Sequence, residues 1–166
     1  MASHSKLPEN ESAPPVHACP ACGERGKRVA RLTMEHLLLP QLVSQIGRAP
    51  YYFCETATCP VVYFPFAAAA AIFHKPDLQV RVGLKEDDDP IPICYCFEIT
   101  RKDIWDEIEQ TGAATIPSRI KSEVQAGNCA CEVKNPSGKC CLGNVTRAVQ
   151  QGLKTISLME TAKSGD

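Results

Sequence analysis

The chain has 166 residues and a formal net charge of −1. This length suits one ordinary domain or two small ones, and the balanced charge excludes the basic surface that attracts phosphates, so no nucleic-acid partner is expected. Ten residues are cysteine. Such a frequency indicates either disulfides in an oxidising compartment or metal ligands in a reducing one.

The N-terminal segment favours the reducing compartment. Residues 1–16 are polar and lack the apolar core of a secretory signal, so we predict a disordered tail on a soluble, cytoplasmic protein. The apolar stretch 61–73 is interrupted by a proline and is too short to span a bilayer, so no membrane insertion is expected. His4 and His17 are expected to be solvated, with metal ligation by His17 as the less favoured alternative.

Residues 17–84 are predicted to form a small β-rich subdomain. Alternating residues indicate a strand at 27–33. A helix over about 34–46 should follow, with Thr33 as its N-cap, and it should be kinked or interrupted at Pro40.

Two short strands and an acidic connection complete the first half. Aromatic and β-branched residues at 51–54 and 61–64 predict the strands of a hairpin. The alanine run 67–71 suits a helix or a buried strand equally. Residues 85–93 combine an acidic cluster with two prolines, and we interpret them as an exposed linker.

Residues 94–155 are predicted to form a mainly helical subdomain, followed by a tail at 156–166. Three helices are expected from capping residues, prolines and glycines, at 101–110, 117–126 and 142–151. Thr100 with Asp103 marks the start of the first helix, and Gly152 marks the end of the third.

Four cysteines of the first half form two closely spaced pairs, Cys19 with Cys22 and Cys54 with Cys59. Cys19-Pro-Ala-Cys22-Gly is typical of a knuckle whose backbone N–H groups donate to sulfur. Two such pairs suit a tetrahedral zinc site. A subdomain this small buries little apolar surface, so metal ligation would stabilise its fold.

Two alternatives to zinc exist for these four cysteines. They can be free thiols, or the first pair can be a thioredoxin-like redox motif. The redox motif is disfavoured because no βαβ unit surrounds it. Four thiolates leave no open coordination position, so the predicted zinc is structural.

The second half contains a different cysteine pattern. Cys94-Tyr-Cys96 has a one-residue spacing that is unusual for zinc and suits an iron pair. Cys131 follows, and Cys140 and Cys141 lie beyond an Asn-Pro-Ser-Gly turn. We predict a [2Fe–2S] cluster on these thiolates.

The fourth ligand of the predicted cluster has three candidates. Cys141 is favoured because it directly precedes the helix expected at 142–151, whose first N–H groups can stabilise a thiolate. Cys140 and Cys129 are the alternates. The predicted fold class is therefore α+β, with a zinc-stabilised β-rich subdomain followed by a mainly helical [2Fe–2S]-binding subdomain.

Five segments of the sequence resemble the N-terminal zinc/[2Fe–2S] module of CopZ-type copper chaperones. They are CPAC, YYFCETATCPVVYF, VRVGLKE, PICYC and CEVKNPSGKCC, and they extend over residues 17–150. The second half, with CYCFEIT followed by helices and a cysteine-containing turn, is also similar to the [2Fe–2S] domains of the bacterioferritin-associated ferredoxin type.

The resemblance implies one zinc ion and one [2Fe–2S] cluster, and a role in copper handling. The cluster would be a one-electron centre that reduces Cu(II) to Cu(I) for a partner, either a copper chaperone or a copper-transporting ATPase. Full chaperones of this type also carry a Met-x-Cys-x-x-Cys copper loop, and no such motif occurs in these 166 residues. We therefore expect electron transfer and no tight copper binding by this chain.

Two alternative functions remain open at this point. The protein can be a non-redox interaction module whose metals are structural and whose surface docks a transporter or reductase. In the other alternative, both cysteine sets bind zinc and the protein contains no iron. Enzymatic activity is not expected, because the sequence contains no nucleophile–base signature, phosphate-binding loop or telling pair of carboxylates.

Overall fold

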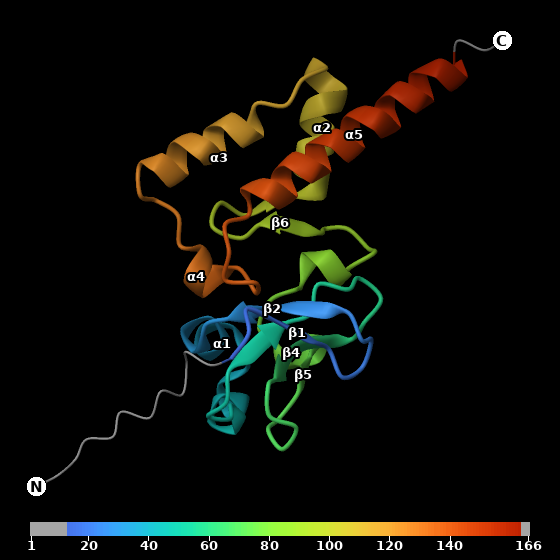
Figure 1. Cartoon of the computed structure of the whole chain (residues 1–166). Coiled ribbons are helices and arrows are strands. Elements are labelled where there is room, and N and C mark those ends of the chain that lie inside the picture. Colours follow the sequence, from blue (N-terminus) through green and yellow to red (C-terminus); the bar gives the residue numbers. More distant parts are fainter. Residues whose placement is uncertain (1–12, 164–166) are drawn as a thin grey trace, which may run out of the picture.

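The computed structural model describes residues 13–163 (Figure 1). In this part of the chain a five-stranded antiparallel sheet precedes a small hairpin and several helices, which confirms the predicted α+β fold class. The tail predicted at the N-terminus lies mostly outside the described residues, and Val16 already belongs to the first strand. No helix within residues 13–163 has the length and apolar content needed to cross a membrane.

The sheet follows the order of the chain, with each strand antiparallel to the one before it. Its strands are β1 (Val16–Ala18), β2 (Arg25–Val29), β3 (Tyr51–Phe53), β4 (Val61–Pro65) and β5 (Phe73–His74). The predicted hairpin is confirmed as β3 and β4. Phe53 and Tyr63 pack into the core on one side of this hairpin, while Tyr52 and Phe64 pack with the four cysteines of the first half. Both strands are therefore buried.

Two short helices lie between β2 and β3, namely α1 (Arg31–Leu37) and the 3-10 helix η1 (Pro40–Gln45). The helical segment predicted over 34–46 is interrupted just before Pro40, as the sequence allowed, but it begins earlier than predicted, at Arg31. The predicted end of the strand at residue 33 and the predicted cap are wrong. The N-cap is Ala30, and Thr33 is a buried residue inside α1. The chain is extended at Leu39 because a residue that precedes proline disfavours the helical region.

The alanine run at 67–71 forms turns, so it is neither the helix nor the strand that the sequence allowed. The chain must reverse there because β4 and β5 are antiparallel. Ala70 and Ala71 still pack against the core. Two 3-10 helices follow β5, η2 (Lys75–Asp77) and η3 (Gly83–Lys85).

The second half begins with a hairpin of β6 (Pro92–Cys94) and β7 (Ile99–Thr100). Four helices follow: α2 (Arg101–Thr111), α3 (Ile116–Gln125), α4 (Cys131–Lys134) and α5 (Leu142–Lys163). The predicted cap is confirmed, because Thr100 and Asp103 form a reciprocal capping box at the start of α2. Gly112, with a φ of 73°, ends that helix.

The end of α5 corrects a prediction. The helix does not stop at Gly152 but continues to Lys163, through most of the segment expected as a tail. Gly152 lies beneath the ring of Trp105, where a Cβ atom would come within 2.7 Å of the indole. The indole N–H donates to the carbonyl of Ala148 (3.2 Å), and the guanidinium of Arg101 lies 4.8 Å from the ring centroid. Glycine here permits close helix packing.

The two halves are in direct contact through α1 and α4 (Figure 1). The hydroxyl of Tyr63, on β4, donates a buried hydrogen bond of 2.6 Å to the carbonyl of Pro136. Gly138, with a φ of 69°, lies against Thr33 so closely that a Cβ would be 2.8 Å from the threonine hydroxyl. The predicted turn at 135–138 is confirmed, and it is the part of the second half that meets the sheet.

Candidate metal centres

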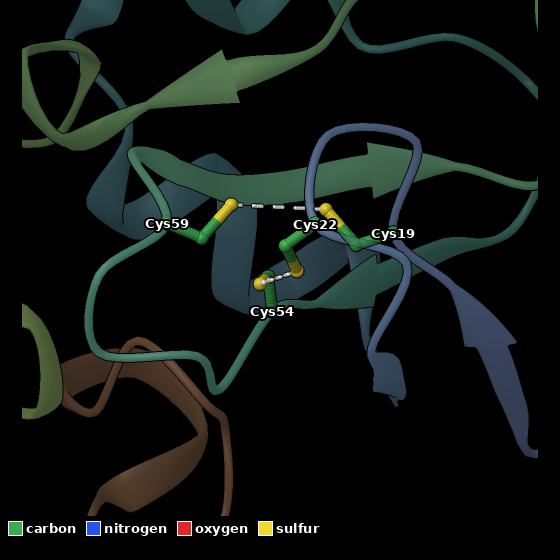
Figure 2. Close-up of side chains that lie close together, drawn as sticks. All are labelled: Cys19, Cys22, Cys54 and Cys59. Carbon is green, nitrogen blue, oxygen red and sulfur yellow. Dashed lines mark hydrogen bonds between the residues drawn. The ribbon is translucent and has the colours of Figure 1, made fainter.

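Four sulfur atoms meet beside β3 and β4 (Figure 2). The Sγ atoms of Cys19 and Cys59 are 3.9 Å apart, and those of Cys22 and Cys54 are 3.7 Å apart. All four lie within 4.8 Å of one another. A zinc ion bonded tetrahedrally to four sulfurs at about 2.3 Å separates neighbouring sulfurs by about 3.8 Å. The predicted zinc ligands therefore have the spacing of a Zn(Cys)4 site.

Two turns present these cysteines. The carbonyl of Cys19 accepts a hydrogen bond of 2.9 Å from the N–H of Gly23, whose φ of 77° closes the first turn. Backbone N–H groups of Ala21 and Cys22 donate to the Cys19 sulfur, as expected for a knuckle. The second pair brackets the loop between β3 and β4, so pairing of these strands fixes its position.

The pKa values of these thiols favour a bound cation. The hydrogen bond between Cys22 Sγ and Thr56 Oγ1 (3.4 Å) lowers the pKa of the Cys22 thiol to about 6. Burial raises the pKa of Cys59 to about 12, and burial also raises that of Cys19. The thiol of Cys22 therefore ionises readily, while those of Cys59 and Cys19 resist ionisation. A divalent cation would stabilise the thiolate form of all four cysteines. A closed set of four sulfurs fits a structural zinc ion.

His17 does not belong to this group of four sulfurs. Its ring centroid lies 4.9 Å from that of Phe66 and 5.4 Å from that of Tyr52. The histidine is therefore packed against aromatic rings, which corrects the expectation that it is solvated. His4 lies outside the described residues.

Five sulfur atoms gather in the second half. Cys94 and Cys141 have their Sγ atoms 3.0 Å apart, and the Sγ atoms of Cys96 and Cys131 are 3.4 Å apart. The Sγ atom of Cys129 is 3.0 Å from that of Cys131 and 3.9 Å from that of Cys96. The sulfurs of Cys96, Cys129 and Cys131 all lie within 4.8 Å of one another, so the structure groups two favoured ligands with the alternate Cys129. Cys94 and Cys141, the other two favoured ligands, form a close pair outside that group.

The two adjacent cysteines of this region are separated in space. Cys141 is 1% exposed and places its sulfur beside Cys94, whereas Cys140 is exposed. Helix α5 begins at Leu142, the residue after Cys141. Cys131 is itself the first residue of α4. Two of the favoured ligands therefore lie at or next to helix N-termini, where backbone N–H groups favour thiolates.

Hydrogen bonds among these thiols decide which of them ionise. Hydrogen bonding with Cys141 lowers the pKa of Cys131 to about 5 and that of Cys94 to about 7. The same two contacts raise the pKa of Cys141, and burial raises that of Cys96 to about 12. The N–H of Ala130 donates to the Cys96 sulfur (3.2 Å). Thiolate sulfur is a donor to zinc and to iron–sulfur clusters, so this donor set could hold a metal ion or an iron–sulfur cluster.

Comparison with a solved structure decides the family. The chain aligns with the X-ray structure of the Archaeoglobus fulgidus CopZ N-terminal domain with a TM-score of 0.65 and 33% sequence identity. The alignment covers 79% of this chain and 96% of that one. The chain belongs to the family of CopZ N-terminal domains. The resemblance to CopZ found in the sequence is thereby confirmed.

Two further comparisons place the CopZ relationship along the chain. The copper chaperone CopZ of Archaeoglobus fulgidus is 36% identical over 132 residues, which are 78% of this chain and 60% of that protein. The chain thus spans less than two thirds of the length of this CopZ relative. Residues 16–79 match the CopZ family model described as a zinc binding domain. This range contains the whole four-cysteine cluster, so the chain is a CopZ-like metal-binding protein with a zinc-binding domain.

Three side chains of this CopZ-like protein that position the sites were missed in the sequence. Thr56 lies between the second pair of zinc cysteines, and a hydroxyl in that loop was an available signal. Tyr95 lies inside the Cys-x-Cys motif and donates to the carbonyl of Arg81 (2.7 Å). Lys85 is only 4% exposed, although we assigned it to a linker. Nothing in the sequence marks it, because lysine is usually solvated.

Proposed function

We propose that this CopZ-like protein is a zinc- and [2Fe–2S]-binding one-electron carrier of copper homeostasis, which reduces Cu(II) to Cu(I) for a partner. The observation that carries the proposal is the arrangement of four thiols in two close pairs, Cys94 with Cys141 and Cys96 with Cys131. A [2Fe–2S] cluster held by four thiolates has two of them on each iron. The arrangement supports this ligand set.

The proposed cluster ligands differ in their exposure to solvent. When bound, the cluster supplies reversible one-electron reduction. Cys94 is 0% exposed and Cys141 is 1% exposed, whereas Cys96 and Cys129 are half-buried. Exchange of an electron with a partner requires close approach. We therefore propose the side of Cys96 as the face that the partner contacts.

Copper is the proposed substrate because the matched relative is described as a copper chaperone. The 166 residues contain no Met-x-Cys-x-x-Cys motif, so the copper in this proposal is held by a separate domain or protein. A copper chaperone and a copper-transporting ATPase are the proposed partner classes. The protein then has an accessory electron-transfer activity and no enzymatic activity of its own.

The proposed location is the cytoplasm. All ten cysteines are free thiols, and no pair of them is joined by a disulfide. Thiols in this number persist in a reducing compartment.

The test is an anaerobic reaction with copper. Protein reduced with dithionite and freed of excess reductant is mixed with Cu(II), and Cu(I) is measured with a chromogenic chelator while visible absorbance is followed. We expect about one Cu(I) for each cluster, together with return of the oxidised spectrum. Failure of reversible reduction, or Cu(II) left unchanged, would favour the non-redox interaction module.

A matched control is needed because free thiols also reduce Cu(II). Cys131→Ser removes a proposed ligand, and Cys140→Ser removes an exposed thiol that the proposal does not use. The rapid phase of Cu(I) formation should be lost in the first variant and kept in the second. Equal rates in the two variants would show that thiols alone reduce the copper, which contradicts the proposal.

A further inference from the structure

Among residues 13–161, Lys85 is the only charged residue that is fully buried, with 4% of its surface exposed. Its ammonium donates hydrogen bonds to the carbonyls of Thr56 (2.6 Å) and Cys59 (2.9 Å). Both carbonyls belong to the loop that carries the second pair of zinc cysteines. Lys85 therefore reaches from the segment before the second half into the zinc site.

A buried ammonium needs more than two neutral carbonyls. Removing its charge from water is costly unless an opposite charge lies nearby. The four thiolates of a Zn(Cys)4 site carry a formal net charge of −2 with the zinc ion included, and Cys59 both accepts from Lys85 and belongs to that set. The lysine and the zinc site therefore compensate each other's burial.

The backbone around Lys85 also contacts the second site. Lys85 ends η3, whose first residue, Gly83, donates its N–H to the hydroxyl of Tyr95 (2.9 Å). Tyr95 lies between two proposed cluster ligands. Gly83 also packs so closely on β6 that a Cβ would be 1.9 Å from the carbonyl oxygen of Pro92. The ammonium of Lys75 donates to the carbonyl of Lys85 (2.9 Å) and so holds the C-terminal end of η3.

We propose that Lys85 is the counter-charge and positioning residue of the zinc site, and that η3 couples that site to the strand that presents Cys94 and Cys96. Loss of the ammonium leaves the carbonyls of Thr56 and Cys59 without their donor. The zinc loop then loosens at one end of η3, and β6 loses support at the other end.

The test compares three variants of the full chain as purified with zinc. Lys85→Met keeps the length of the side chain and removes its charge and donors, while Lys85→Arg keeps the charge. Lys154→Met removes a charge from an exposed lysine on α5, which has no part in η3 or the zinc loop, as the matched control. Zinc release to an excess of a chromogenic chelator is followed in each variant.

We expect zinc release about tenfold faster in Lys85→Met than in the wild type, the size of a lost charge-assisted hydrogen bond. Lys85→Arg should release zinc more slowly than Lys85→Met, and Lys154→Met should resemble the wild type. A rate in Lys85→Met equal to that of the wild type overturns the proposal. So does equal acceleration by Lys85→Met and Lys154→Met, because it reports a general effect of charge.

The coupling is measured by amide hydrogen exchange on the same samples. Protection at residues 92–97 should fall in Lys85→Met while protection in α3 is unchanged. A uniform fall throughout the chain would mean general destabilisation and would contradict the coupling through η3. Neither readout involves iron or copper, so the outcome is independent of the proposed electron transfer.

Discussion

The turns that follow the two cysteine motifs make the same conformational demand and meet it differently. After the first zinc pair the left-handed residue is Gly23, with a φ of 77°, and it adopts this conformation without strain. After Cys94-Tyr-Cys96 the left-handed residue is Glu98, with a φ of 54°. A residue with a side chain pays roughly 1 kcal/mol for this conformation. The zinc turn is relaxed and the second turn is strained.

The sulfur atoms show the same difference between the two sites. The zinc site has four sulfurs, supplied by turns next to strands, with the two closest pairs at similar separations of 3.7 and 3.9 Å. The second site has five sulfurs at uneven separations from 3.0 to 3.9 Å, with a sixth cysteine exposed nearby in the sequence. A closed, even set suits a structural ion. The second site combines a strained turn with buried and half-buried cysteines and has one sulfur more than a four-ligand set needs.

The largest expected effect concerns the zinc site. Cys54→Ser should lower bound zinc from about one equivalent towards none and cost several kcal/mol of stability, because metal ligation contributes to the folding free energy of such small units. Zinc content and thermal melting measure this. Cys140→Ser, which alters an exposed thiol, is the control and should change neither. Full zinc and a native melting profile in Cys54→Ser would refute the ligand assignment.

The second prediction asks which sulfurs of the second site are ligands. Cys131→Ser and Cys141→Ser should each abolish visible colour and bound iron while zinc stays at about one equivalent, because a [2Fe–2S] cluster needs four donors. Cys129→Ser and Cys140→Ser should keep the colour. Absorbance and metal analysis of the four variants settle the set. Loss of colour in Cys129→Ser, with colour kept in Cys141→Ser, would reverse our choice of the fourth ligand.

The third prediction tests how firmly the two regions are joined. Tyr63→Phe leaves the buried carbonyl of Pro136 without its donor, so we expect a loss of about 1–3 kcal/mol in the free energy of unfolding. Tyr52→Phe is a matched control, because that hydroxyl bonds Pro14 within the first half. Denaturant unfolding compares them. An equal or larger loss of unfolding free energy in Tyr52→Phe would show that the hydrogen bond between the halves contributes no more than one within the first half.

The smallest expected effect concerns the strained turn. Glu98→Gly should raise the free energy of unfolding by up to about 1 kcal/mol, because glycine adopts a positive φ without a steric penalty. Glu98→Ala keeps the penalty and should give no such gain. Both are measured by thermal melting of the protein as purified. Equal stabilisation by the two substitutions would point to the charge of Glu98 as the cause and not to its backbone.

The parts of the structure that were predictable from sequence are those specified by neighbouring residues. The capping box at Thr100, the hairpin of β3 and β4, and the meeting of the four zinc cysteines depend on short motifs. The continuation of α5 was not predictable, because it depends on Trp105 packing over Gly152 from another helix. The burial of Lys85 depends likewise on a loop distant in sequence.

The packing of Trp105 has a consequence for spectroscopy. It is the single tryptophan of the chain, and its indole is held between α2 and α5 by Ala148, Gly152 and Arg101. Selective excitation of tryptophan therefore reports on the helical half alone, while Tyr51, Tyr52 and Tyr63 lie in the sheet and Tyr95 bonds the segment between the two halves. The chain thus contains its own fluorophore for following one half of the molecule without adding a label.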